Sequence, residues 1–268
     1  CDRKLRIGVR FDYDPRFADF AIGPDNQPVY RGYEIDVARK LAGALGVTIE
    51  WVRVTADNRL LFAQTDQVDL VLATMLHTAA RAKQAKFLNT HYFSSETVIV
   101  GRKSDLFIPG RGQKGSVCIT SGHYAIPSLL AEGIRLILYS DIGGLLQALK
   151  SGHCQFAAQD DVVFERWLEK PGFATTFEIK TALAPGYWGV GVSSSMPIDI
   201  ADLLDNSLQA LHRIGTLVQL AEHHSINAAY LEQQEARWAS PKCISMPADC
   251  IDKPISTRKH LRVHLMFE

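Results

Sequence analysis

The sequence lacks the features of several large protein classes. It has 29 basic and 29 acidic residues among 268 and no formal net charge at pH 7, whereas a nucleic-acid-binding protein needs a basic surface to release counterions from phosphates. No apolar run reaches the ~18–20 residues that cross a bilayer, and no signal peptide is visible. We therefore expect a water-soluble globular protein without a nucleic-acid partner.

Short motifs for common catalytic and cofactor sites are also missing. The sequence contains no GxSxG, GxxxxGK[S/T] or HExxH motif. Gly110 and Gly112 precede a strand-like segment, so they lack the context of a phosphate-binding loop. His223 and His224 are adjacent on an expected helix, where their side chains point ~100° apart and rarely share a metal. We expect no metal and no cofactor.

The five cysteines fit no zinc-binding pattern, because their spacing matches neither a ribbon nor a finger. Cys243 and Cys250 enclose a short loop, which favours a disulfide in an oxidising compartment and two free thiols in the cytosol. Cys118 and Cys154 fall in expected strands, and we interpret them as buried, unreactive thiols. Cys1 is compatible with a lipid-modified terminus. The pattern slightly favours an exported protein.

Strand-like and helix-like segments alternate along most of the chain. Expected strands are residues 5–9, 47–51, 68–73, 96–101, 116–120, 134–138, 155–158, 175–180 and 187–192. Expected helices are residues 33–45, 57–64 (capped by Asp57), 78–86 (capped by Thr78), 123–131, 141–150 and 160–169. From Pro197 onward the periodicity is purely helical, with a break at Gly215.

This alternation predicts an α/β protein in which mainly parallel sheets are covered by helices. A strand-like segment meets Gly or Pro near 98–103 and again near 184–190, which predicts two lobes joined by two hinge crossovers. We expect residues 1–98 and 190–240 to form one lobe, residues 99–189 the other, and residues 241–268 an extension of unknown role. A ligand is expected in the cleft between lobes, beyond the carboxyl ends of the strands.

One stretch points to an anion. An apolar strand ends near Thr74, and Thr78 begins a helix with Arg81 in its first turn. The helix dipole disfavours a guanidinium there, so its position needs another reason. An anion bound by backbone N–H groups and the planar Arg81 fork supplies one. The alternative is an ordinary solvated arginine.

The same stretch carries a resemblance to a known family. Ala-Thr-Met-x-x-Thr-x-x-Arg from position 73, followed by an aromatic pair, resembles the polar amino-acid branch of the bacterial periplasmic solute-binding proteins. Other pieces agree in order: Leu-Arg-Ile-Gly-Val from position 5, Gly-Tyr-Glu-Ile-Asp-Val-Ala from 32, Asn-Arg-Leu-Leu from 58 and Gly-Val-Gly-Val from 189. The resemblance covers roughly residues 4–225. It implies a two-lobed type II (Venus-flytrap) fold whose hinge closes on a ligand.

The resemblance also implies roles for particular residues. Arg81 matches the family's clamp for the ligand carboxylate, and backbone groups of Thr74 and Leu76 complete the contacts of the first lobe. Asp160 matches the acid that binds the ligand ammonium from the second lobe, with Asp161 as its competitor. Both ligand charges need partners, because burying either one alone costs several kcal/mol.

Two further arginines bear on the ligand side chain. Arg10 and Arg59 match positions where binders of acidic amino acids carry basic residues, which implies glutamate or aspartate. The alternative is exposed ion pairs of Arg10 with Asp12 or Asp14, and of Arg59 with Asp57, which contribute little. Both interpretations remain open.

The remaining site residues include departures from the family pattern. Leu76 stands where the family has a hydroxyl, and His123 and Tyr124 replace small residues of a second-lobe loop, narrowing that side. Tyr13 is a candidate wall for the ligand. The ligand identity therefore stays open.

The resemblance implies a non-enzymatic component of an ABC amino-acid importer, with an amino acid and a membrane permease as partners. Its expected location is periplasmic or extracellular, with or without a membrane anchor. One alternative is the extracellular ligand-sensing domain of a receptor or channel. Another is a cyclohexadienyl (prephenate or arogenate) dehydratase, which needs a general acid such as Glu96 or Glu178.

Overall fold

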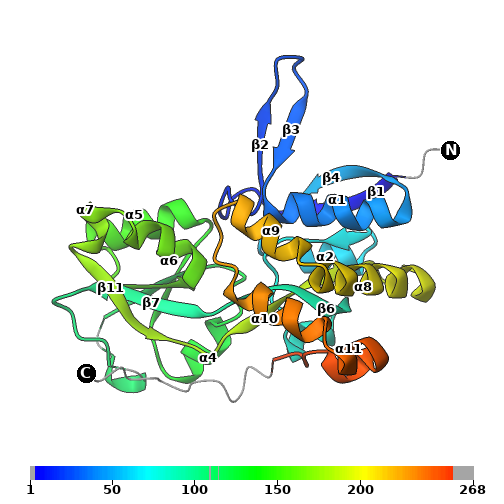
Figure 1. Ribbon diagram of the computed structural model, residues 1–268. Coiled ribbons are helices and arrows are strands. Elements are labelled where there is room, and N and C mark those ends of the chain that lie inside the picture. Colours follow the sequence, from blue (N-terminus) through cyan, green and yellow to red (C-terminus); the bar gives the residue numbers. More distant parts are fainter. Residues whose placement is uncertain (1–3, 109, 114, 256–268) are drawn as a thin grey trace. The chain divides into compact units, whose positions relative to one another are not determined.

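The computed structural model describes residues 4–108, 110–113 and 115–255 in two compact units (Figure 1). The first unit contains the described residues up to Ser94 and from Tyr187 to Ile255, and the second runs from Ser95 to Gly186. These boundaries precede the expected ones by a few residues. Residues 241–255, part of the predicted extension of unknown role, belong to the first unit, and residues 256–268 lie outside the described part.

The first unit is built on a five-stranded sheet of order β4-β1-β5-β12-β6. The strands are β1 (Lys4–Val9), β4 (Thr48–Arg53), β5 (Leu70–Val71), β6 (Lys86–Ser95) and β12 (Gly186–Val192). β1 pairs in parallel with β4 and β5, but β12 pairs antiparallel with β5. The expectation of a mainly parallel sheet therefore holds on the β4–β1–β5 side only, because the crossover strand β12 runs the opposite way.

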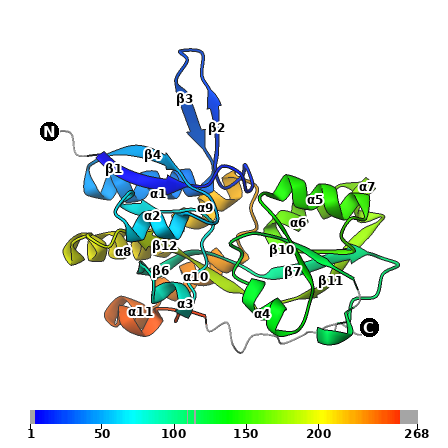
Figure 2. The same cartoon turned by 180° about the vertical axis from the view of Figure 1, so that it is seen from behind.

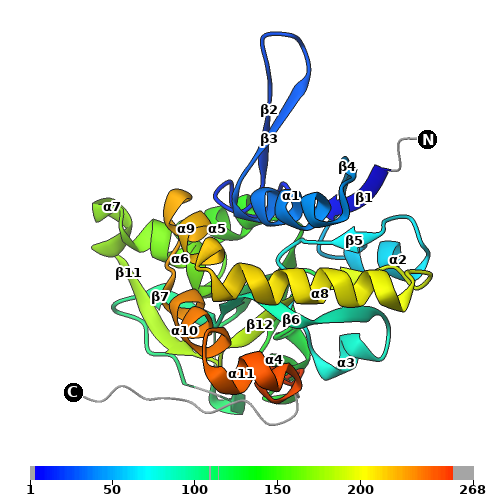
Figure 3. The ribbon, with the colours of Figure 1, turned by 45° about the vertical axis from the view of Figure 1, so that its right-hand side comes forward.

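Helices pack around this sheet. They are α1 (Tyr33–Leu45), α2 (Arg59–Gln64), α3 (Ala79–Ala82), α8 (Ile198–Arg213), α9 (Thr216–His223), α10 (Ala229–Trp238) and α11 (Pro241–Ser245), with the 3-10 turn η2 (Pro247–Cys250). α8 lies beside α1 and α10 (Figure 3). A hairpin of β2 (Asp19–Ile22) and β3 (Pro28–Arg31) stands away from this unit (Figure 1), in a stretch where the sequence pattern predicted neither a strand nor a helix.

Local capping explains where the helices begin and end. α1 ends at Gly46, whose φ of 64° suits a residue without a side chain. The Thr78 hydroxyl accepts a hydrogen bond from the Arg81 N–H and caps α3, as expected. The prediction that Asp57 caps α2 is wrong: Asn58 is the N-cap residue, and its side chain instead accepts from the N–H of Thr55.

The second unit has a five-stranded sheet of order β11-β7-β10-β8-β9. Its strands are β7 (Thr97–Arg102), β8 (Val117–Thr120), β9 (Leu136–Tyr139), β10 (Phe156–Asp160) and β11 (Phe177–Ala182). Its helices are α4 (Ile126–Ala131), α5 (Ile142–Ser151), α6 (Asp161–Leu168) and α7 (Pro171–Ala174), with the 3-10 turn η1 (Gly110–Gly112). α5 and α6 cover one face of the sheet and α4 the other (Figure 2). β8 pairs in parallel with β9 and β10, whereas β7 runs antiparallel to β10 and β11.

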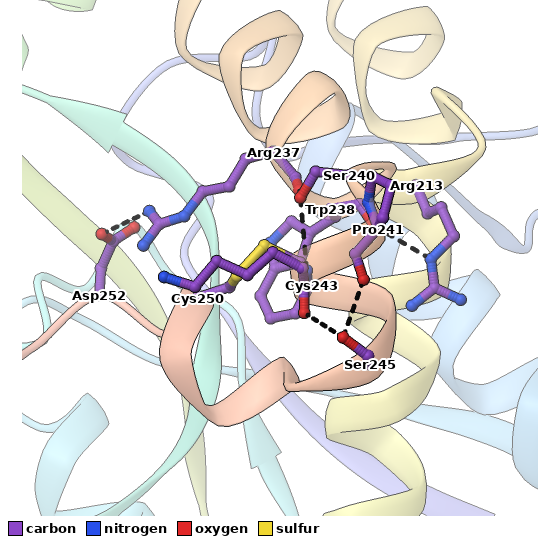
Figure 4. Close-up of a disulfide and its surroundings, with 10 residues drawn as sticks. Arg213, Arg237, Trp238, Ser240, Pro241, Cys243, Ser245, Cys250 and Asp252 are labelled. Atoms are coloured by element: carbon purple, nitrogen blue, oxygen red, sulfur yellow. Dashed lines mark hydrogen bonds and ion pairs between the residues drawn. A yellow bond between two sulfur atoms is a disulfide. The ribbon is translucent and has the colours of Figure 1, made fainter.

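Both units contain a disulfide. Cys118 and Cys154 are bonded with Cα atoms 5.8 Å apart, so the interpretation of these residues as free thiols is wrong. The parallel pairing of β8 with β10 brings the two cysteines together, and sequence spacing does not show this. Cys243 and Cys250 form the second disulfide, which packs on Trp238 (Figure 4).

The segment after this second disulfide pairs with the chain just before α3. Ala79 N–H donates to the Ile255 carbonyl at 2.9 Å, and Ile255 N–H donates to the His77 carbonyl at 3.3 Å. Arg237 and Asp252 form an ion pair at 2.7 Å that holds the segment to α10. Within the described residues, no helix combines the length and the apolar character needed to cross a membrane.

Candidate functional site

In the first unit, the carboxyl ends of two neighbouring parallel strands bring candidate residues together. Arg10 directly follows β1, and Thr74 follows β5 by three residues. Because β1 and β5 pair in parallel, both residues emerge at the same edge of the sheet. This edge is where α/β sheets commonly bind ligands.

The Thr74 turn is held from both sides by buried charged side chains. Thr74 has a φ of 50°, a left-handed conformation that residues with a Cβ rarely adopt. Its N–H donates to Glu34 Oε1 at 2.6 Å. Arg59 Nη1 donates to the carbonyl of Thr74 at 2.9 Å and also to the carbonyl of Ala73. The structure therefore places Arg59, a candidate reader of the ligand side chain, against the backbone of the turn.

Leu76 presents its backbone away from the neighbouring strand. It forms an antiparallel bridge with Trp188, in which His77 N–H donates to Tyr187 and Gly189 N–H donates to Met75. In such a bridge the N–H and carbonyl of the central residue point to the other side. No partner for the Leu76 N–H is found among the described residues.

Arg81 lies beside the backbone of Leu76. Its Nη1 donates to the Leu76 carbonyl at 3.0 Å, so the guanidinium is fixed next to the Leu76 N–H. A planar guanidinium with a neighbouring backbone donor is the geometry that binds a carboxylate. The structure thus brings together Arg81 and Leu76, which the sequence separates by five positions.

Arg10 is buried, with 3% of its surface exposed. Its Nε donates to Asp12 Oδ1 at 2.8 Å, which agrees with the ion-pair alternative. Its Nη2 is buried without a hydrogen-bond partner within the described part of the chain. The guanidinium also lies 5.2 Å from the ring centre of Tyr13, and that ring packs edge-on against Trp188.

Sequence reasoning missed the role of Glu34. This carboxyl is fully buried, and besides Thr74 its Oε1 accepts from the Tyr92 hydroxyl at 2.5 Å. Burial raises the pKa of Glu34 to about 7, although these hydrogen bonds and the positive charges of Arg59 and Arg10 lower it. The available signal was an acidic residue on the apolar face of the helix over residues 33–45.

The second unit gathers its candidates in the same way, at the carboxyl ends of β8 and β10. His123 Nε2 lies 3.3 Å from Asp160 Oδ1, and both side chains are almost completely buried. The His123 ring stacks on Tyr124, whose hydroxyl accepts from Thr97 Oγ1 at 2.7 Å. Burial and the charge of Asp160 raise the pKa of the Tyr124 hydroxyl above its usual range. This hydroxyl therefore stays protonated.

Asp161, the competitor of Asp160, is engaged in starting α6. Its backbone N–H donates to the Glu96 carbonyl at 2.8 Å, and its Oδ1 accepts from the Val162 N–H at 2.8 Å. Burial and the neighbouring charge of Asp160 raise the pKa of Asp161 to about 7. These contacts suit a helix-initiating residue, and they make Asp160 the better candidate for a ligand.

A cavity of about 530 Å³ in the first unit does not coincide with these candidates. It is lined by His77, Phe87 and residues of α8 and of the segment 251–254, but by none of the residues predicted to bind a ligand. The candidate ligand site is therefore defined by the Arg81 guanidinium and the Leu76 N–H, not by this cavity. No cluster of metal-binding side chains occurs among residues 4–108, 110–113 and 115–255.

Comparisons with known proteins agree on a family. The sequence profile of the bacterial extracellular solute-binding proteins, family 3, matches residues 5–226. The ABC transporter arginine-binding protein 1 of Escherichia coli is 23% identical over 225 residues, which are 82% of this chain and 89% of that protein. The glutamine-binding protein of Geobacillus stearothermophilus is 22% identical over 166 residues, 60% of this chain and 62% of that protein.

Solved structures show the same fold. An ancestral arginine-binding protein bound to arginine has a TM-score of 0.70 at 22% identity, with 83% of this chain and 99% of that chain covered. A solute receptor for L-cysteine from Neisseria gonorrhoeae has a TM-score of 0.69 at 22% identity, with 82% and 89% covered. The α/β architecture described above is therefore that of bacterial solute-binding proteins.

Proposed function

Since the chain belongs to family 3 of the bacterial extracellular solute-binding proteins, we propose that it captures an amino acid and delivers it to a membrane ABC permease. The family is one of binding proteins, and two relatives named above are an arginine-binding and a glutamine-binding protein. This supports a binding role over the dehydratase alternative. Two disulfides within the described residues support an oxidising, extracytoplasmic location. A lipid anchor at Cys1 belongs to the same proposal.

The arrangement of Arg81 beside the Leu76 N–H carries the proposal. An α-carboxylate placed there receives two hydrogen bonds from the guanidinium plane and one from the backbone. The Leu76 backbone supplies this donor whatever its side chain is, so the missing family hydroxyl does not prevent binding. Thr74 shapes the site through its left-handed turn, because its carbonyl and hydroxyl already accept hydrogen bonds from Arg59.

In the second unit, Asp160 is proposed to bind the ligand ammonium. Its carboxylate is buried next to His123, and a buried carboxylate is the group that pairs with an ammonium. Tyr124 stacks on His123, and its hydroxyl is held by Thr97.

For the ligand side chain, Arg10 supports an oxygen-bearing group. The Nη2 of Arg10 is buried and has no hydrogen-bond partner among the described residues, so an acceptor on the ligand would complete it. A carboxylate, as in glutamate or aspartate, is one such acceptor. Arg59 gives less support to an acidic amino acid as the ligand, because its guanidinium already donates to the Thr74 turn.

Isothermal titration calorimetry with the twenty amino acids tests this function. We expect binding of glutamate or aspartate, and a loss of at least about a hundredfold in affinity for Arg81→Ala, which removes a charge-assisted pair. Arg53→Ala is the control, since Arg53 is an exposed arginine at the end of β4 in the same unit. Unchanged binding by Arg81→Ala would refute the assigned site. Binding of arginine or glutamine but not glutamate would refute the acidic ligand alone.

A further inference from the structure

The Thr74 turn is strained, and the residues that hold it are buried charges. A left-handed residue with a Cβ is unfavourable by roughly 1–2 kcal/mol unless its surroundings impose the conformation. Glu34 binds the N–H of Thr74, and Arg59 binds its carbonyl and its Oγ1. The two groups of the Thr74 residue that could otherwise rotate are therefore clamped by opposite charges.

Burying the carboxyl of Glu34 costs free energy of desolvation. It is fully buried, and its Oε2 has no hydrogen-bond partner within the described residues. The groups that face its carboxyl are the Tyr92 hydroxyl from β6, the Thr74 N–H, and the guanidinium charges of Arg59 from α2 and Arg10 after β1. An apolar or amide side chain of similar size would avoid the desolvation of this charge.

We propose that Glu34 is a positioning residue for ligand binding, which holds Thr74 in its left-handed conformation so that the N–H of Leu76, two residues later, faces the ligand. This inference rests on the proposed function. Glu34 does not contact the ligand itself. Its carboxylate acts through the Thr74 N–H, and Arg59 acts through the Thr74 carbonyl. Strained conformations of this kind concentrate at ligand-binding sites because they pre-organise contacts.

Two variants of Glu34 separate positioning from simple packing. Glu34→Gln keeps an oxygen that accepts from Thr74 N–H and Tyr92 but removes the charge, whereas Glu34→Ala removes both. We expect Glu34→Ala to bind the amino acid at least about tenfold more weakly, as for the loss of one hydrogen bond to a charged group. We expect Glu34→Gln to stay within about threefold at pH 6.

The pH dependence is the readout that a packing role would not change. The pKa of Glu34 is about 7, so the wild-type carboxyl is mostly neutral at pH 6 and mostly ionised at pH 8. A neutral acceptor holds Thr74 N–H less tightly than a carboxylate. The ratio of the Kd of Glu34→Gln to that of the wild type should therefore be near one at pH 6 and rise by pH 8. Taking the ratio of the two Kd values cancels the titration of Asp161, which both proteins share.

The experiment is calorimetry of folded protein at pH 6, 7 and 8, with the melting temperature of each variant measured alongside. Unchanged affinity in Glu34→Ala together with a lower melting temperature would overturn the inference and leave Glu34 a structural residue. If Glu34→Ala does not fold, a Kd ratio for Glu34→Gln that stays constant with pH overturns it equally. If the wild type binds no amino acid, the proposed function itself fails; if it binds and these variants behave as wild type, only the positioning role fails.

Discussion

The Nδ1 of His77 lies 2.9 Å from the Nε2 of His91, and both rings are buried in the first unit. One of the pair donates to the other, so at most one proton lies between them. His212, also buried, contacts the His91 carbonyl at 2.7 Å. Burial lowers the pKa of His77 and of His212 to about 4 and that of His91 to about 3. These histidines are neutral at pH 7.

These three histidines predict acid sensitivity. In the unfolded chain they have their ordinary pKa of 6.5, so below that pH the unfolded state binds protons that the folded state does not. The free energy of unfolding should therefore fall as the pH drops from about 6.5 towards 4, by on the order of 1–3 kcal/mol per histidine. Urea denaturation at pH 7, 6 and 5 measures it.

His91→Gln should reduce this pH slope, and His153→Gln, which replaces an exposed histidine in the second unit, should not change it. A free energy of unfolding that stays constant between pH 7 and 5 would contradict the assignment of the buried histidines as neutral.

The disulfides should stabilise the two units to different degrees. Cys118–Cys154 closes a loop of 36 residues and Cys243–Cys250 one of 7. Loop-closure entropy then predicts a loss of about 3–4 kcal/mol for Cys118→Ala/Cys154→Ala and about 2 kcal/mol for Cys243→Ala/Cys250→Ala. Denaturation of both variants with and without reductant is the measurement. A larger loss for the shorter loop would show that packing against Trp238, rather than chain entropy, dominates.

Arg81 should not tolerate replacement by lysine. Its guanidinium donates to the Leu76 carbonyl from a planar array of N–H groups, and an ammonium cannot reproduce this planar arrangement. Arg81→Lys should weaken amino-acid binding by about tenfold or more. Lys83→Arg, at the end of the same helix, is the matched control. Full affinity in Arg81→Lys would mean that only the charge of Arg81 matters.

Asp160 and Asp161 should differ in what their replacement changes. Because the pKa of Asp161 is raised to about 7 by burial and by Asp160, its ionised form opposes folding above pH 7. Asp161→Asn keeps the oxygen that accepts from Val162 N–H, so it should raise the free energy of unfolding at pH 8 by on the order of 1–3 kcal/mol. This gain should shrink as the pH falls through 7 towards 4.

For ligand binding, replacing Asp160 should have a much larger effect than replacing Asp161. Asp160→Asn should abolish or strongly weaken amino-acid binding, and Asp161→Asn should leave it within about threefold of wild type. Calorimetry of the two variants decides this, and equal losses in both would mean that the pair binds the ammonium jointly.

Local patterns predicted many elements well. The helix expected over residues 33–45 coincides with α1, because its apolar spacing and the glycine at position 46 are properties of the segment itself. The helix expected over 78–86 ends at Ala82 instead, since Lys86–Ser95 joins the sheet as β6. Pairing with β12, nearly a hundred residues away in sequence, decides that outcome, and no local pattern contains it.

Part of the candidate site could also be predicted from the sequence, and part could not. Arg81 and Leu76 are close in sequence, and the spacing of a cap and a helix start already indicated an anion site. The role of Arg59 could not be read from its neighbours, because its partner carbonyl lies 15 positions away in Thr74. The sequence therefore left a ligand-reading role and an ion pair open, while the structure shows a backbone contact.

The sequence by itself determined the family, the α/β alternation and the order of the elements, because these depend on periodicity and on residues a few positions apart. Only the tertiary structure decided which charges are buried and what they hold. Glu34 meets the Tyr92 hydroxyl across 58 positions, and that contact together with the Thr74 N–H keeps a buried carboxyl in place. Burial sets the cost of a charge, and burial is a property of the packed chain rather than of any segment.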